Sequence, residues 1–305
     1  MNTGRSNPNE NSFCSMNTLK PVAPSCCRSC TAPLRHTFAD LGMSPLANSY
    51  IDADHWNAME RFYPLHVYVC EHCFLVQLES IARPEEIFSD YAYFSSYSDS
   101  WLEHARRYTE CVIKRFGLNR QSWVVEIASN DGYLLQHFVA KDIPVLGIEP
   151  AKNVAEAALR HGIPTQIRFF GDATARELVQ GGEQADLIIG NNVLAHVPDL
   201  NGFVTGLKIL LKPNGVITLE FPSLMRLMEE NQFDTIYHEH FSYFSLVAVE
   251  RVLARHGLDV FDVEELPTHG GSLRIYACHQ DDTTKQVDRR VQELLAREKH
   301  AGLLN

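Results

Sequence analysis

An alternation of short apolar segments and helical patterns, which begins near residue 120, most constrains what this chain can fold into. Four apolar segments share the pattern, at 123–128, 144–150, 186–192 and 215–221. Strands separated by helices form a parallel sheet with right-handed crossovers. We therefore expect an α/β fold with a Rossmann-like, doubly wound sheet. Two more strand patterns, at 259–266 and 272–279, predict an antiparallel hairpin that closes the sheet.

The turn after the first strand indicates the kind of ligand. In such sheets, ligands bind at the carboxyl ends of the strands. This turn has one glycine, Gly132, where a dinucleotide-binding turn has three to let the backbone approach a pyrophosphate. Glu126 and Asp131 place acid at the end of the first strand, and Glu149, at the end of the second, is placed to accept both hydroxyls of a ribose. This pattern favours S-adenosylmethionine.

Three alternatives stay open: the ligand is NAD, the sheet is a scaffold without a ligand, or Glu149 is simply a solvated residue at the end of a strand. The residues expected to bind the cofactor are Glu126, Ala128, Asn130, Asp131, Gly132, Glu149, Pro150, Asn191 and Asn192.

The second constraint is a set of cysteines near the N-terminus. Cys27 and Cys30 form one CxxC pair, and Cys70 and Cys73 form another about 40 residues later. Two CxxC turns can complete a tetrahedral shell of four thiolates around Zn²⁺. A shell of four cysteines leaves no open position, so the predicted zinc is structural. Buried thiols without metal and a redox CxxC are the alternatives, and Cys26 is the spare cysteine.

Composition excludes several classes of protein. The 305 residues are 45% hydrophobic, enough for a sizeable core, and carry 27 basic against 38 acidic residues, a net charge of −11. No basic stripe is present to neutralise phosphates, so nucleic acid is an unexpected partner. No apolar run is long enough to span a bilayer, and the first 20 residues are polar. We expect no membrane partner and a cytoplasmic location.

A third cluster, Tyr237-His238-Glu239-His240, follows the strand at 215–221. Imidazole titrates near neutral pH and is the usual general base, and a neighbouring carboxylate can fix its tautomer. His196 lies beyond the strand that ends at Asn191 and Asn192, on the same rim of the sheet. A loop without function is the alternative interpretation of this segment.

The order of several motifs resembles that of the S-adenosylmethionine-dependent sugar C-methyltransferases, which act on nucleotide-linked 4-keto deoxysugars. The motifs are SPLANSY at 44–50, CEHC at 70–73, VVEIASNDGYLL at 124–135, GIEP at 147–150, NNVLAHVPD at 191–199, DTIYHEHFSYFS at 234–245 and THGGSLRIY at 268–276. The resemblance runs from about residue 26 to the end and is far more specific for the family than for the substrate.

The resemblance places five residues in the family's active site: Tyr91, His196, Tyr237, Glu239 and His240. A carbon beside a ketone becomes nucleophilic only after it loses a proton, so the reaction needs a base and donors for the enolate oxygen. We expect His240 to be the base, with Tyr237 the other candidate. Tyr237 and His196 then act as donors or relay, Glu239 orients His240, and Tyr91 contacts the sugar or its phosphates.

The C-terminus is where the chain departs from the family pattern. Members usually continue for roughly another hundred residues, whereas this chain ends in a helical pattern at 285–304. We therefore expect a chain that lacks the family's C-terminal domain, with a separate chain as a possible supplier of that domain. An exposed apolar surface is then expected around Leu294, Leu295, Leu303 and Leu304.

The predicted organisation has five parts: a disordered leader at 1–22, a zinc-binding domain at 23–82, a linker and helix over the active site at 83–118, a methyltransferase domain at 119–282 and the start of a truncated region at 283–305.

Two other functions stay open. The chain could be a catalytically silent protein that binds S-adenosylmethionine and zinc, or it could methylate oxygen or nitrogen of a small molecule.

Overall fold

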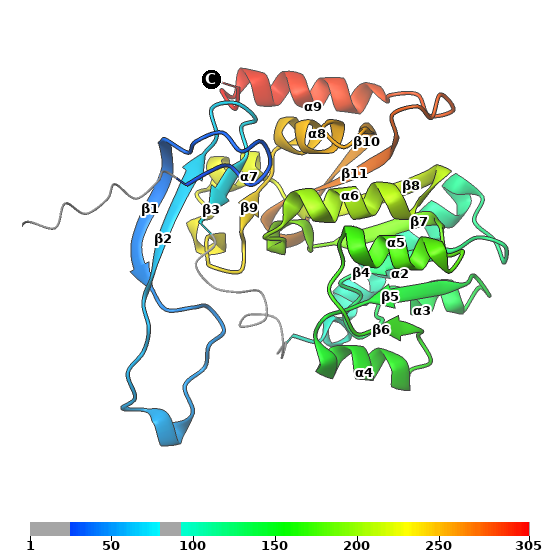
Figure 1. The fold of residues 1–305 in the computed structure, drawn as a ribbon, viewed down its shortest axis with the longest axis horizontal. Coiled ribbons are helices and arrows are strands. Elements are labelled where there is room, and N and C mark those ends of the chain that lie inside the picture. The colour runs from blue at the N-terminus through cyan, green and yellow to red at the C-terminus, as the bar shows by residue number, and fades with distance from the viewer. Residues whose placement is uncertain (1–24, 80–92, 305) are drawn as a thin grey trace, which may run out of the picture.

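The computed structural model describes residues 25–79 and 93–304, and a seven-stranded sheet forms its centre (Figure 1). The order of this sheet is β10-β11-β8-β7-β4-β5-β6. Its strands are β4 (Val124–Ile127), β5 (Val145–Ile148), β6 (Thr165–Gln166), β7 (Ala185–Asn191), β8 (Leu211–Pro222), β10 (Leu258–Leu266) and β11 (Ser272–His279). The strands β4 to β8 are parallel, while β11 is antiparallel to both β8 and β10. The predicted doubly wound fold and closing hairpin are confirmed.

Helices cover both faces of this sheet because its strands are apolar on both sides. Side chains alternate across β4: Val125 and Ile127 pack on one face and Val124 on the other. The first face is covered by α5 (Asp172–Gln180), α6 (Leu200–Leu210), α8 (Leu246–Ala254) and α9 (Arg289–His300). The second face is covered by α2 (Asp99–Phe116), α3 (Gln136–Val139) and α4 (Lys152–Arg160).

A second, four-stranded antiparallel sheet carries the cysteines and reaches the predicted catalytic segment. Its order is β1 (His36–Ser44), β2 (Tyr63–Val69), β3 (Val76–Leu78) and β9 (Ser242–Tyr243). Strand β9 directly follows the Tyr237–His240 segment and pairs with β3. Between β1 and β2, the chain extends away from the rest of the molecule in a long connection (Figure 1). The cysteine-bearing sheet therefore holds one end of the catalytic segment.

The last helix, α9, packs against α8 and β10 (Figure 1). Leu294 is 2% exposed within the central core, and Leu295 and Leu303 pack against it. The Glu298 carboxylate, fully buried, accepts hydrogen bonds from the backbone amides of Leu246 (2.7 Å) and Val247 (2.9 Å) at the start of α8. The expected exposed apolar surface around Leu294 is therefore wrong, because α8 and the hairpin already cover these leucines.

Among the described helices, none combines the length and the apolar character that crossing a membrane requires.

Candidate active site

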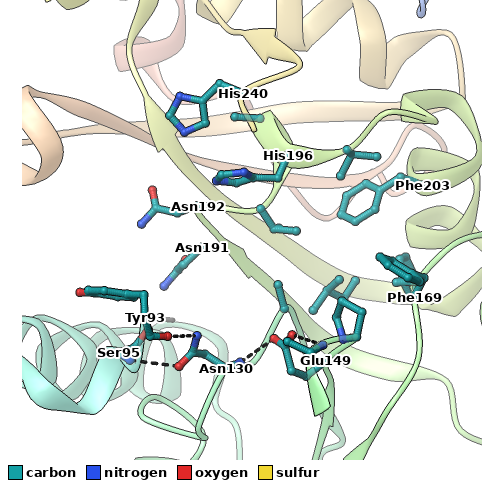
Figure 2. Close-up of a pocket in the computed structure, with 18 of the residues that line it drawn as sticks. Tyr93, Ser95, Asn130, Glu149, Phe169, Asn191, Asn192, His196, Phe203 and His240 are labelled. Atoms are coloured by element: carbon teal, nitrogen blue, oxygen red, sulfur yellow. Dashed lines mark hydrogen bonds between the residues drawn. The ribbon is translucent and has the colours of Figure 1, made fainter. Parts of the chain in front are cut away.

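A cavity of about 590 Å³ opens at the carboxyl ends of β4, β5, β7 and β8 (Figure 2). A volume of this size lies within the range of small-molecule sites. The cavity is lined by residues predicted at the ends of these strands and by residues predicted for catalysis: Ala128 and Asn130, Glu149 and Pro150, Asn191 and Asn192, and His196, Tyr237 and His240. The two ends of the cavity differ in construction, and we call them the cofactor end, around Glu149, and the acceptor end, around His240.

The cofactor end begins with a contorted turn after β4. Ala128 (φ 57°), Asn130 (φ 51°) and Gly132 (φ 81°) all have left-handed backbone conformations. A Cβ on Gly132 would lie 2.8 Å from Ile163 Cγ1, so this position requires glycine for both its backbone and its packing. The turn points backbone amides toward the end of β5.

Glu149 receives these amides. Its carboxylate accepts hydrogen bonds from the backbone N–H of Asn130 (2.9 Å) and of Ala151 (2.8 Å), as the dashed lines in Figure 2 show. Burial raises the pKa of Glu149, although both amides oppose that shift by favouring the charged form. The backbone therefore fixes the Glu149 carboxylate before any ligand binds.

Asn130 joins the turn to the segment that precedes α2. Its side-chain oxygen accepts a hydrogen bond from the Ser95 amide (3.0 Å), and its side-chain nitrogen donates to the Tyr93 carbonyl (3.1 Å). Tyr93 and Ser95 also line the cavity. The side chain of Asn130 thus holds the segment over the cofactor end, a role that its place in the sequence did not indicate.

Three predicted cofactor residues, Glu126, Asp131 and Gly132, do not line the cavity. Glu126 is 1% exposed, and burial, followed by the charges of Glu149 and Asp131, raises its pKa well above the usual value. Asp131 accepts a hydrogen bond from the Ser96 amide (3.1 Å). These residues lie beneath the cofactor end and support it.

His240 dominates the acceptor end. Its Nδ1 lies 2.8 Å from the Thr235 carbonyl oxygen, and its Nε2 lies 3.0 Å from the Tyr237 hydroxyl. A carbonyl can only accept, so Nδ1 carries the hydrogen, and Nε2 accepts a hydrogen bond from Tyr237. Burial lowers the pKa of His240 to about 4, which keeps the ring neutral. A neutral imidazole whose acceptor nitrogen receives a hydrogen bond from a phenol can take up a proton.

His196 approaches the same imidazole from the end of β7. The two ring centroids are 4.8 Å apart in an edge-on arrangement, visible in Figure 2. Burial, and then the charge of His240, lower the pKa of His196 to about 3. The acceptor end therefore holds two neutral imidazoles in contact.

Two residues of the Tyr237–His240 segment point elsewhere. His238 Nε2 lies 3.1 Å from the Pro64 carbonyl on β2. Glu239 is 4% exposed, and its carboxylate accepts a hydrogen bond from the Asn48 side chain (2.6 Å). The predicted role of Glu239 as orienter of His240 is therefore corrected: the Thr235 carbonyl orients His240, and Glu239 binds the connection between β1 and β2. Tyr91 lies outside the described residues.

Several cavity residues were not expected from the sequence, namely Tyr93, Ser95, Trp101, Phe169, Phe203 and His269. Trp101 belongs to an amphipathic helix stripe, which predicts a core position rather than a cavity wall. Phe169 and Phe203 carry no motif. His269 precedes two glycines, which was the one available signal for a special backbone conformation.

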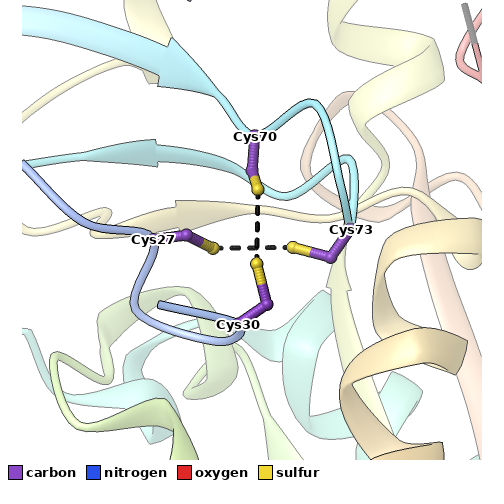
Figure 3. A group of neighbouring side chains, drawn as sticks. All are labelled: Cys27, Cys30, Cys70 and Cys73. Atoms are coloured by element: carbon purple, nitrogen blue, oxygen red, sulfur yellow. Dashed lines mark hydrogen bonds between the residues drawn. The ribbon is translucent and has the colours of Figure 1, made fainter. Parts of the chain in front are cut away.

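The four predicted zinc ligands converge, with their sulfur atoms pointing at a common centre (Figure 3). All four Sγ atoms lie within 4.8 Å of one another; Cys27 and Cys73 are 3.5 Å apart, and Cys30 and Cys70 are 3.4 Å apart. Zn–S bonds of about 2.3 Å in a tetrahedron imply sulfur separations of about 3.8 Å. The cluster therefore fits one zinc ion, and Cys26 is exposed outside it.

Arg28 connects this cluster to the cavity. Its guanidinium donates hydrogen bonds to the carbonyls of Leu78 and Pro198 (3.0 Å for Pro198), and it lies over the Phe241 ring at 5.4 Å. Pro198 lines the cavity, and Phe241 directly follows His240. The metal-binding turn thus contacts the rim of the acceptor end.

Three family models match the chain. A model described as "Putative zinc binding domain" matches residues 27–88, and one described as a methyltransferase domain matches residues 101–263, more than half of the chain. The chain belongs to this methyltransferase family. The predicted cofactors, S-adenosylmethionine and a structural zinc ion, are confirmed at the level of the family and of the four-cysteine cluster.

The third model, described as a C-methyltransferase C-terminal domain, matches residues 267–305. The prediction that this methyltransferase lacks the C-terminal domain is therefore wrong. The matched segment is integral to the fold, because it supplies β11, between β8 and β10, and the buried side of α9.

Known proteins similar to this methyltransferase include C-methyltransferase NovU from Streptomyces niveus, 34% identical over 91% of the chain and 66% of NovU. The chain thus spans about two thirds of the length of that relative. A ubiquinone biosynthesis O-methyltransferase from Rhizobium etli is 28% identical over 46% of the chain and 60% of the relative. The PH0226 protein from Pyrococcus horikoshii has the same fold, with a TM-score of 0.50, 14% identity, and 64% and 97% of the two chains covered.

Proposed function

We propose that this methyltransferase transfers a methyl group to a carbon beside the ketone of a nucleotide-linked 4-keto deoxysugar. One observation carries the proposal: the neutral His240, with Nε2 on the Tyr237 hydroxyl, faces the same cavity as the backbone-held Glu149 carboxylate. Carbon methylation needs a base beside the methyl donor, and the two ends of the cavity supply both sites. The similarity to C-methyltransferase NovU supports this reaction class.

At the cofactor end, Glu149 binds the ribose hydroxyls, while Asn130, Pro150 and the β7 residues Asn191 and Asn192 enclose the remainder. When bound there, S-adenosylmethionine supplies an electrophilic methyl on sulfur. The buried side-chain oxygen and nitrogen of Asn191 make no hydrogen bond within the described residues. A buried polar group without a hydrogen-bond partner is energetically costly, so the Asn191 side chain fits a role in ligand binding.

At the acceptor end, the Tyr237 hydroxyl and His240 remove the proton. Because the Tyr237 hydroxyl already occupies His240 Nε2, the proton passes through the tyrosine oxygen to the imidazole. The Nδ1–H stays on the Thr235 carbonyl, which stabilises the imidazolium that forms. His196 contacts the His240 ring and completes the polar wall around the enolate oxygen.

No lysine or arginine lines the described part of the cavity. A neutral sugar ring suits such a wall, whereas a diphosphate requires cations or backbone amides. We therefore propose that the nucleotide of the substrate binds outside this cavity.

The test is a single-turnover assay of the full chain with S-adenosylmethionine and a nucleotide-linked 4-keto-6-deoxy sugar, read as solvent deuterium exchange and as a new carbon-bound methyl group by NMR. Exchange and methylation that both disappear in His240→Ala support the proposal. The O-methyltransferase relatives suggest the second candidate, methylation of oxygen, which needs no carbon deprotonation. A methyl group found on oxygen, with activity kept in His240→Ala, would establish that alternative.

A further inference from the structure

The turn that connects β10 to β11 has an unusual backbone. His269 has φ 51° and ψ 40°, and Gly270 and Gly271 follow with φ of 78° and 110°. Glycine adopts such conformations freely, but a histidine there is strained. Strain of this kind persists only where neighbouring structure enforces it, and it concentrates at functional sites.

Three elements hold this turn in place. The Thr268 hydroxyl donates to Glu220 on β8 (3.0 Å), the Gln232 side chain donates to the Gly270 carbonyl (2.8 Å), and the Ser223 amide donates to the Gly271 carbonyl (3.0 Å). The conformation of His269 is therefore imposed from outside the turn.

Glu220 anchors the turn to a buried charge network. Its carboxylate, fully buried, pairs with Arg274 (2.6 Å) and with His104 (3.0 Å). Burial would raise the pKa of Glu220, but the hydrogen bond from His104 and the charge of Arg274 outweigh it and lower the pKa. An ion pair in such a position adds little net stability compared with apolar packing, so its value here lies in fixing geometry.

The side chain of His269 has no role in the core. It is exposed and lines the cavity, and within residues 25–79 and 93–304 it makes no hydrogen bond. Its ring contacts the Trp101 ring edge-on at 5.1 Å. His269 and His240 line the same cavity, and the charge of His269 adds a small contribution to the lowered pKa of His240. Both ring nitrogens are available to a ligand.

We propose that His269 donates a hydrogen bond to an oxygen of the methyl acceptor, and that Glu220 and Thr268 are positioning residues for it. This inference rests on the proposed function. The acceptor is then held between His269 and Trp101 on one side and the Tyr237–His240 pair on the other, so the reacting carbon faces the base. An oxygen-rich, neutral ring fits this set of groups.

The experiment compares His269→Ala, His269→Gln and His269→Gly with the unaltered chain, using a nucleotide-linked 4-keto-6-deoxy sugar and isothermal titration with S-adenosylmethionine. We expect His269→Ala to lower kcat/KM about 10- to 100-fold, the loss expected for one hydrogen bond to the substrate. His269→Gln, which keeps an N–H donor, should recover part of that loss. Affinity for S-adenosylmethionine should stay unchanged, and the exposed His300→Ala serves as control.

His269→Gly separates binding from structure. Glycine relieves the left-handed strain, so this variant should melt at or above the temperature of the unaltered chain and still lose turnover. Full activity in His269→Gly and His269→Ala, with turnover by the unaltered chain, would overturn the role of His269 alone. No turnover of the sugar by the unaltered chain would overturn the proposed function, and this role with it.

Discussion

The two ends of the cavity are built in different ways. At the cofactor end, main-chain amides hold the Glu149 carboxylate, and three left-handed residues shape the turn that supplies one of them. At the acceptor end, the Tyr237 and His196 side chains contact His240, and one main-chain group, the Thr235 carbonyl, accepts a hydrogen bond from it. The first arrangement is local to two neighbouring strands. The second assembles segments that start near residues 196, 235 and 269.

The two ends of the cavity therefore depend on different parts of the molecule. The cofactor end is built from the parallel sheet and the segment at 93–95 that Asn130 holds over it. The acceptor end also depends on the cysteine-bearing sheet, because β9 pairs with β3 and Arg28 contacts the rim at Pro198. Disturbing the zinc cluster should therefore affect the two ends unequally.

Removal of zinc should have the most extensive effect, because both the metal content and the turnover fall. Cys70→Ser should lower bound zinc from one ion per chain to near zero and reduce methyl transfer at least about 100-fold, the loss typical of misplaced reacting groups. Binding of S-adenosylmethionine should persist, since the cofactor end lies in the other sheet. Metal analysis and titration calorimetry measure the two effects. Cys26→Ser, beside the cluster, is the control and should keep the zinc; equal loss at both ends would refute the comparison.

The next effect concerns the base. His240→Ala should abolish solvent exchange of the sugar's α-proton and lower turnover by about 10²- to 10⁴-fold, as for loss of general base catalysis. S-adenosylmethionine should still bind. Deuterium incorporation followed by NMR measures the exchange. If exchange persists in this variant and stops in Tyr237→Phe, the tyrosine is the base.

A smaller effect is expected at the cofactor end. Glu149→Ala should weaken S-adenosylmethionine binding by about 1.5–3 kcal/mol, because charge-assisted hydrogen bonds to the ribose are lost. Glu156→Ala on the surface of α4 is the matched control. An unchanged dissociation constant in Glu149→Ala would remove the assignment, and added NAD should give no binding heat.

The smallest effect is a pH dependence of stability from the acceptor end. His240 and His196 have folded-state pKa values of about 4 and 3, below the ordinary 6.5 of the unfolded chain. As the pH falls below 6.5, the unfolded chain takes up protons first, so stability is full above that pH and falls on acidification. Urea unfolding at pH 7 and 5.5 should show a loss of about 1 kcal/mol per histidine, reduced in His240→Gln. An identical loss in His240→Gln would contradict this source.

Sequence reasoning succeeded where the physics is local. Strand and helix patterns follow from the spacing of apolar residues, and a CxxC turn aims two thiolates by itself, so the sheet and the cysteine cluster could be predicted. It placed Glu126 and Asp131 at the correct strand end but could not show that these acids lie outside the cavity. Nor could it show that the left-handed turn at Ala128 and Asn130 directs a backbone amide toward Glu149.

The long-range pairs were beyond the sequence. Glu239 sits beside His240 in the chain, so it was expected to orient that imidazole, yet the fold turns its carboxylate toward Asn48, 191 residues away. Likewise, the leucines of α9 suggested a missing partner, whereas α8 and β10 already covered them. Periodicity shows that a face is apolar but not which element covers it.

Apolar periodicity and cysteine spacing were sufficient to predict the layers of the fold and the cluster of Cys27, Cys30, Cys70 and Cys73. Contacts between distant segments fix which of the predicted site residues face the cavity, that the Thr235 carbonyl sets the tautomer of His240, and that His269 lines the cavity. The physical reason is range. Apolar periodicity and turn chemistry act over a few residues, whereas a site is set by contacts between segments far apart in the chain. The sequence of one segment does not show which distant segment it contacts.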